Sequence, residues 1–177
     1  MQVPEELSHK GMGIVVFWLT AVLVTIADQA TKVAVRHVLP LGSPGRTLIP
    51  GVIDLVHIEN TGAAFSIGRG ASWLFIGCAI VAFVAACMLV WNNDLPFPLI
   101  LSLGCVAGGG VGNMIDRLAT GSVTDFLATT FIDFPVFNVA DIFVTCGVAV
   151  SMLHYLRWEA TAGRAGAAAD DEERTDA

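Results

Sequence analysis

Three aspartates, Asp116, Asp125 and Asp141, lie at or between the ends of two long apolar segments. A carboxylate this close to hydrocarbon must be paired, protonated or hydrated, and in membrane proteins such residues mark functional sites by default. Two of the aspartates share a spacing, because Asn113 precedes Asp116 by three residues and Asn138 precedes Asp141 by three. Residues three apart lie on one face of a helix, so we expect each Asn to orient its Asp.

Paired carboxylates can hydrolyse a peptide bond. Two carboxyl groups about 3 Å apart cannot both ionise, so they share a proton and can activate a water molecule that attacks a carbonyl carbon. Asp116 and Asp141 also have structural interpretations, as an interfacial ion pair with Arg117 and as a helix cap respectively. Asp125 has no such neighbour, and Asp133, before Phe-Pro, is most simply a turn residue. The residues alone give two or three candidates and do not select the pair.

Other chemistries have weaker support. No HExxH motif occurs and the four histidines lack ligand spacing, which argues against a zinc peptidase and a metal site. The four cysteines fall within apolar segments, where thiols behave as small hydrophobic groups. Lys32 and Ser66 share a loop, as a serine–lysine peptidase requires, but nothing in the sequence holds the lysine beside the serine. A small transporter or proton relay remains an alternative, although the acids lie at segment ends and no inverted repeat is visible.

The composition identifies the elements that must position these acids. Hydrophobic residues make up 55% of the 177 residues and charged residues only 14%, with a mean hydropathy of +0.71, which indicates an integral membrane protein. Four segments, 12–27, 72–91, 97–115 and 136–156, approach the roughly 20 residues that span a bilayer. We therefore predict an all-α membrane protein with four transmembrane helices. The first segment is not read as a removable signal peptide, because it runs directly into Asp28 and a polar motif.

The number of crossings predicts where the acids meet. Four helices place both termini on one side of the membrane and the loops 28–71 and 116–135 on the other. Asp28, Asp116, Asp125 and Asp141 then share one membrane face. The terminal side carries four basic residues and the loop side five, so the positive-inside rule does not settle the orientation.

Two further patterns concern local structure. Residues 52–59 alternate between apolar and polar side chains, which predicts a small β element in the first loop. Gly104, Gly108 and Gly112 recur at four-residue steps in the third segment, a pattern typical of close helix packing.

Four sequence blocks follow one another along the chain. They are D-Q-x-x-K at 28–32, N-T-G-A-A-F-S at 60–66, G-N-x-I-D-R at 112–117, and V-x-D-F at 123–126 followed by F-N-V-A-D at 137–141. In this order, on a four-segment chain of this size, they resemble the lipoprotein signal peptidases, the type II signal peptidases of bacteria. Two positions depart from the pattern of that family: Thr124 stands where a second valine is more usual, and the 16-residue step from Asp125 to Asp141 is short. Neither departure removes a functional group, so they bear on the shape of the loop and not on activity.

The resemblance implies an aspartic endopeptidase that removes signal peptides from diacylglyceryl-modified prolipoproteins, cutting before the lipidated cysteine. It assigns the catalytic dyad to Asp125 and Asp141. Residues expected to support the dyad or bind substrate are Asp28, Lys32, Asn60, Gly62, Asn113, Asp116, Arg117, Asn138 and Ala140. A lipopeptide-binding protein without cleavage is a further alternative, against which the intact acids argue.

The resemblance also implies a location and partners. It places the protein in the bacterial cytoplasmic (inner) membrane, with both termini in the cytoplasm. The chain then divides into an N-terminal tail at 1–11, a four-helix peptidase domain at 12–157 and a tail at 158–177. This last tail lies outside the resemblance, and its acidic composition predicts a disordered extension. The dyad is expected near the outer face, below a sheet cradle and short surface helix in the first loop. We expect a monomer that contacts membrane lipids, binds no nucleic acid, metal or cofactor, and is inhibited by globomycin-type cyclic lipopeptides.

Overall fold

Four long helices form the body of the molecule in the computed structural model, which describes the backbone of residues 5–62 and 70–175 and the side chains of 9–62 and 70–157. The helices are α1 (Glu5–Val38), α2 (Ser72–Asn92), α3 (Phe97–Thr120) and α4 (Val139–Thr175). Stretches long and apolar enough to cross a bilayer occur at His9–Val38, Ser72–Asn92, Phe97–Thr120 and Val139–Arg157. The predicted four-helix membrane fold is confirmed.

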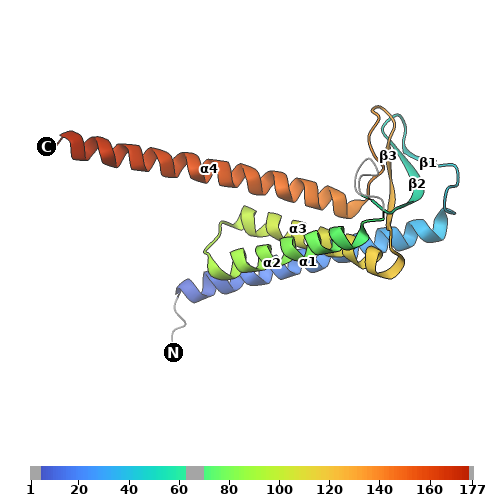
Figure 1. The fold of residues 1–177 in the computed structure, drawn as a ribbon, viewed down its shortest axis with the longest axis horizontal. Coiled ribbons are helices and arrows are strands. Elements are labelled where there is room, and N and C mark those ends of the chain that lie inside the picture. Colours follow the sequence, from blue (N-terminus) through green and yellow to red (C-terminus); the bar gives the residue numbers. More distant parts are fainter. Residues whose placement is uncertain (1–4, 63–69, 176–177) are drawn as a thin grey trace.

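The helices place the two loops that carry the motifs at one end of the bundle. In Figure 1 a small sheet lies at that end, whereas the start of α1, the α2–α3 turn and the end of α4 lie toward the other. This arrangement agrees with the expectation that four crossings place both termini on one side of the membrane and the two motif-bearing loops on the other.

Helix α3 lies at the centre of the bundle and packs against α1, α2 and α4. Its glycines at 104, 108 and 112 all face α1. A Cβ atom added at Gly104 would lie 2.8 Å from the Cβ of Thr20, and one at Gly112 would collide with the carboxyl group of Asp28. Small residues therefore bring the two backbones together, as predicted, and allow Thr25 Oγ1 to donate to the carbonyl of Gly108 at 3.0 Å.

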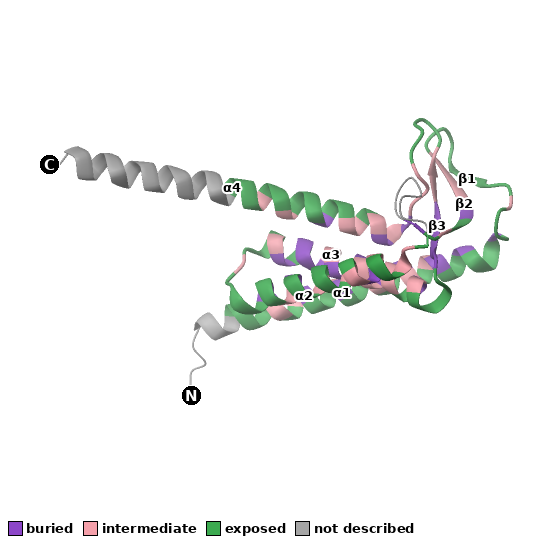
Figure 2. Ribbon diagram, in the orientation of Figure 1, coloured by how far each residue is buried: buried purple, intermediate pink, exposed green. Residues whose placement is uncertain are grey.

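The burial pattern matches a bundle surrounded by lipid. Buried residues gather on α3 and on the sides of α1 and α2 that face it, whereas the outward faces are exposed (Figure 2). Large apolar side chains dominate those outward faces, among them Leu19, Leu23, Val81 and Met88. In water such a surface would be unusually apolar, but it suits contact with acyl chains.

Three antiparallel strands, β1 (Arg46–Ile49), β2 (Ile53–Asn60) and β3 (Val123–Thr129), form a sheet in the order β1-β2-β3. The first two strands confirm the β element predicted in the first loop. The third was not predicted, and Asp125 lies in this strand and not in a loop. Because Val123–Phe126 are all buried, β3 lacks the apolar–polar alternation that would identify a half-buried strand.

Helix α1 is longer than its apolar segment. The predicted boundary near residue 27 is wrong, because the helix continues through Asp28, Lys32 and Arg36 to Val38. These three charged residues lie four apart on one helical face. Lys32 pairs with Asp28 on the same helix, and both Lys32 and Arg36 pair with Asp116 on α3. The helix therefore continues where hydropathy alone indicates a loop.

The acidic tail also differs from its expected conformation. The composition of residues 158–177 suggested disorder, but α4 continues as a helix to Thr175. Seven of its 20 residues are Ala, which has the highest intrinsic helix propensity, and this accounts for the difference.

Candidate active site

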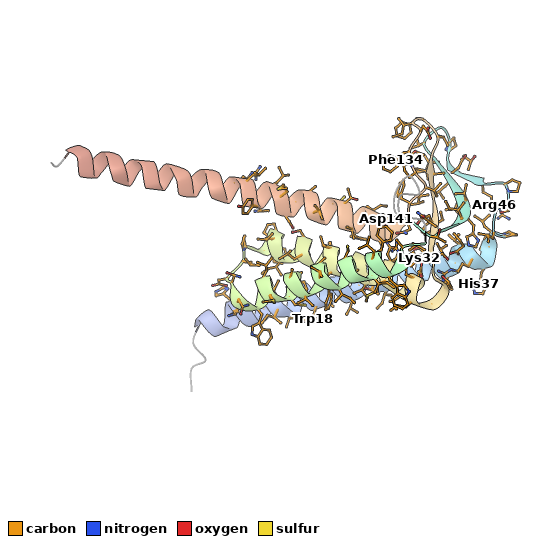
Figure 3. The ribbon with its side chains drawn as sticks, in the orientation of Figure 1. Trp18, Lys32, His37, Arg46, Phe134 and Asp141 are labelled. Carbon is orange, nitrogen blue, oxygen red and sulfur yellow. The ribbon has the colours of Figure 1, made fainter. Side chains whose placement is uncertain are left out.

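The predicted site residues meet where the sheet joins the bundle. They come from α1, the end of β2, the end of α3, β3 and the start of α4. Figure 3 shows Lys32 and Asp141 close together at this point, and Asn113 connects them through hydrogen bonds of 2.8 Å on each side. Segments separated by more than 100 residues thus build one polar cluster.

The start of α4 is fixed by reciprocal capping. Asn138 Oδ1 accepts from the backbone N–H of Asp141 at 3.0 Å, and Asp141 Oδ2 accepts from the backbone N–H of Asn138 at 3.1 Å. Asp28 Oδ1 accepts from the N–H of Ala140 at 3.0 Å. Three backbone donors at the helix start are therefore satisfied, as in a capping box. The capping interpretation of Asp141 is confirmed, and Ala140 takes part through its backbone.

Asparagine amides connect the two aspartates proposed as a dyad. Asn138 Nδ2 donates to Asp125 Oδ1 at 2.7 Å, and Asn60 Nδ2 donates to Asp125 Oδ2 at 2.9 Å. Asn113 Nδ2 donates to Asp141 Oδ1 at 2.8 Å, and its Oδ1 accepts from Asn138 Nδ2 at 3.0 Å. Asp125 and Asp141 are thus held in one continuous network of amides.

This network corrects part of the spacing argument. The expectation that each Asn orients the Asp three residues later is confirmed for Asn138 and Asp141. Asn113 instead directs its side-chain amide to Asp141 on the neighbouring helix. The local spacing identified the right residues but only one of the two pairings.

Asp125 is almost fully buried, with 3% of its surface exposed. Burial raises the pKa of its carboxyl group to about 6, because the ionised form loses hydration, although the hydrogen bond from Asn60 opposes this shift. The charge of Asp141 raises the pKa further, whereas Asn138 lowers it. Asp141 is partly exposed. The two carboxyl groups therefore occupy different environments, as acid and base pairs require.

Asp116 lies in the charged part of the cluster, between α1 and α3. Lys32 Nζ lies 2.8 Å from Asp28 Oδ2 and 3.0 Å from Asp116 Oδ2, and Arg36 Nη2 lies 2.9 Å from Asp116 Oδ1. The expected ion pair of Asp116 with Arg117 is therefore wrong, because α1 supplies its partners. Two acids and two bases balance one another, which offsets the cost of burying charge between α1 and α3.

Lys32 is fully buried and uses its three N–H donors on Asp28, Asp116 and Asn113. An ammonium held by two carboxylates is poorly suited to act as a base. This pairing argues against the serine–lysine alternative. Ser66 lies within residues 63–69, which are outside the described part of the chain.

A cavity of about 420 Å³ opens beside the two aspartates. Its polar wall includes Asp125, Asp141, Asn60 and Arg117, and its apolar wall is formed by Phe134, Pro135, Val136, Phe137, Ile142, Thr145 and Cys146, with Gly62, Asn113 and Val123 completing the lining. The lining therefore offers both groups for proton transfer and apolar surface that suits acyl chains.

Arg117 is part of the lining of this cavity. Its Nη2 donates to the carbonyl of Gly62 at 3.1 Å, and its guanidinium lies 4.9 Å from the centre of the Phe75 ring on α2. The backbone N–H of Gly62 donates in turn to Asn60 Oδ1 at 2.9 Å. Arg117 thus ties the end of β2 to α3, next to the aspartate that Asn60 holds.

Several residues of the cluster were not identified from the sequence. Gln29 Nε2 donates to the carbonyl of Gly112 at 3.0 Å and to Asp116 Oδ1 at 3.3 Å. Arg36 and Glu59 also belong to the cluster. The four-residue spacing from Asp28 through Lys32 would have identified Arg36 if the helix had been extended, whereas Glu59 gave no local signal.

Comparison with known proteins agrees with this geometry. A family model described as Signal peptidase (SPase) II matches residues 20–157. A lipoprotein signal peptidase of Symbiobacterium thermophilum is 43% identical over 137 residues, covering 76% of this chain and 90% of that protein. A lipoprotein signal peptidase of Gloeobacter violaceus is 39% identical over 153 residues, covering 81% and 83% respectively.

A solved structure is similar as well. A bacterial membrane enzyme determined by the in meso method at 2.3 Å resolution superposes with a TM-score of 0.75 and 31% sequence identity, over 83% of this chain and 88% of that one. Fold and sequence likeness therefore cover the four helices and the polar cluster together.

Proposed function

Because the chain belongs to the signal peptidase II family, we propose that Asp125 and Asp141 form the catalytic pair with which it cleaves prolipoprotein signal peptides as an aspartic endopeptidase. The observation that carries this assignment is the position of both carboxyl groups on the wall of one cavity, joined by asparagine amides. Asp28 and Asp116 are engaged by Lys32 instead, so they support the fold of the site.

The geometry supports a general acid–base mechanism. Asp125, buried and with a raised pKa, holds the shared proton, and Asp141 is the ionised partner. A water molecule between them gives a proton to Asp141 as its oxygen attacks the scissile carbonyl carbon, while Asp125 donates its proton to the carbonyl oxygen. In the second step the C–N bond breaks, the leaving nitrogen takes the proton from Asp141, and a gem-diol hydroxyl returns a proton to Asp125.

The dyad is tested with purified protein in detergent and a lipidated prolipoprotein, with cleavage read as a gel shift. Asp125→Asn and Asp141→Asn should each reduce cleavage at least about 1,000-fold, because catalysis needs both groups of the acid–base pair. Asp133→Asn is the matched control, since this acid is exposed and lies outside the cavity. Cleavage at the wild-type rate by either dyad variant would refute the assignment.

The cavity and its surroundings suit a substrate that is itself anchored in lipid. The polar wall can receive the peptide bond while the apolar wall and the outer helix faces meet acyl chains. Each buried CH₂ group contributes about 0.8 kcal/mol, so two acyl chains can dominate recognition. We expect the diacylglyceryl-modified precursor to be cut and the unmodified one to be left intact. Equal rates for the two would show that the peptide alone is recognised.

The orientation in the membrane is part of the same proposal. We place the sheet and the dyad at the outer face of the cytoplasmic membrane, with both termini in the cytoplasm. A cysteine at Thr47, which is exposed on β1, should react with an impermeant maleimide in intact cells without an outer-membrane barrier, and one at Ala168 should not. The native cysteines are first replaced by alanine. The opposite labelling pattern would reverse the orientation.

A further inference from the structure

Thr124 is fully buried and binds three different elements of the fold. Its Oγ1 accepts from Arg36 Nε on α1 at 2.9 Å and donates to Glu59 Oε1 on β2 at 2.9 Å. Its backbone N–H donates to Asp116 Oδ2 on α3 at 3.2 Å. Neither Arg36 nor Glu59 lines the cavity beside the dyad. The mechanism described above uses none of the side chains of Thr124, Arg36 and Glu59.

The direction of the two side-chain hydrogen bonds follows from the groups that make them. A guanidinium only donates and a carboxylate only accepts, so the hydroxyl of Thr124 must accept from Arg36 and donate to Glu59. Both bonds involve a charged partner, which makes them stronger than neutral ones. Valine, with the same shape as threonine, can make neither bond.

Thr124 is the residue immediately before Asp125, and this places the two side chains on opposite faces of β3. Successive residues of a strand point to opposite sides of the sheet. The side chain of Thr124 faces α1, whereas Asp125 lines the cavity. Hydrogen bonds that fix Thr124 on the α1 side of the strand therefore also fix the position of Asp125 on the cavity side.

The strand needs such an anchor. The pairing of β2 with β3 is regular at Glu59 with Thr124 and at Ile58 with Asp125, but its register shifts between Leu55 and Ile58. The ladder is thus interrupted immediately beyond the pair that contains Asp125. Hydrogen bonds from Thr124 to α1, α3 and β2 hold the strand on the other side of this irregularity.

We propose that Arg36 and Glu59, joined through the hydroxyl of Thr124, are positioning residues that hold Asp125 in its catalytic place. This inference rests on the assignment of Asp125 to the dyad. Both charged side chains are about one-third exposed, at 33% for Arg36 and 29% for Glu59. Water can therefore hydrate them when the hydroxyl is lost, so its removal affects the position of β3 more than the stability of the fold.

Thr124→Val is the first test. Misplacement of a reacting group by a fraction of an ångström lowers the chemical rate, so we expect kcat for the lipidated prolipoprotein to fall about tenfold. We expect KM to stay within about twofold and the melting temperature to change little. Thr124→Ser, which restores the hydroxyl, should recover kcat to within about twofold of the wild type. An unchanged kcat in Thr124→Val, or a loss that Thr124→Ser does not recover, would overturn the proposal.

The second test asks whether Arg36 acts through Thr124. Arg36→Lys keeps a positive charge near Asp116 but lacks the Nε donor that contacts the hydroxyl. It should lower kcat as much as Thr124→Val, and the double variant should be no slower than either single variant, because both remove the same connection. Multiplied losses in the double variant would show that the two residues act independently. Arg46→Lys, on the exposed strand β1, is the matched control.

The wild type and Asp125→Asn are measured in the same series. If the wild type does not cleave the substrate, or if Asp125→Asn is fully active, the proposed function or dyad fails. If the wild type cleaves, Asp125→Asn does not, and Thr124→Val equals the wild type, only the positioning role is refuted.

Discussion

Replacing Lys32 with methionine should destabilise the protein strongly, although methionine is also unbranched and only one atom shorter. The ammonium of Lys32 is fully buried and lies within 3.0 Å of Asp28 and Asp116 and 2.8 Å of Asn113. Its loss leaves Asp28 with only neutral donors, from Gln29 and the backbone of Ala140. Breaking a buried ion pair by removing one partner costs about 3–5 kcal/mol.

For a chain of this length, each kcal/mol corresponds to roughly 2–4 °C in melting temperature, so Lys32→Met should unfold about 6–20 °C below the wild type. Unfolding in detergent is followed by tryptophan fluorescence. Cleavage should fall as well, because Lys32 orients Asn113, which in turn holds Asp141. Adding Asp28→Asn should recover part of the lost stability, since it removes the unpaired charge.

Lys10→Met is the control, because this lysine is exposed near the start of α1. A melting temperature for Lys32→Met within about 2 °C of the control would refute the reasoning, since it would mean that the cluster tolerates an unpaired carboxylate. A failure of Asp28→Asn to recover any stability would locate the cost elsewhere than in Asp28.

Three further outcomes are expected. Because the pKa of Asp125 is raised to about 6, the folded protein keeps a proton there that the unfolded chain has already lost, so the stability that this group contributes falls as pH rises from about 4 through 6. The cleavage rate should also decline above about pH 6. If Asp125→Asn leaves the pH dependence of unfolding unaltered, this expectation is contradicted. Gly108→Ala should lower the melting temperature, because the new Cβ would meet the backbone of Ala21, whereas Gly77→Ala, with open space around it, should not; equal melting temperatures would show that the α1–α3 contact adapts. Cleavage should persist in EDTA and after thiol alkylation, and a loss restored by zinc would refute the carboxylate mechanism.

The sequence allowed the helices to be predicted where their signal is local. Hydropathy identified all four spans, because each contains a run of apolar residues long enough to cross a bilayer. The end of α1 was missed because Lys32 and Arg36 pair with Asp116, which lies 80 or more residues away in the sequence. Hydropathy averaged over neighbouring residues contains no information about such distant partners.

For the site as well, the contacts made between neighbouring residues could be predicted and the long-range contacts could not. The pairing of Asn138 with Asp141 was predicted because helix capping is made within four residues. The contact of Asn113 with Asp141 joins two helices, so spacing along α3 pointed to the wrong carboxylate. The choice of Asp125 came from the resemblance to a known family, because its burial and its asparagine partners arise only when β3 pairs with β2.

The capping of α4 links local folding to turnover. Asp141 offers one oxygen to the backbone at the start of the helix and the other to Asn113 beside the cavity. In the proposed mechanism this carboxylate takes up a proton in each turnover, and the protonated group would be a weaker acceptor for the backbone N–H of Asn138. The side chain that we assign to proton transfer therefore also sets how firmly the start of α4 is capped.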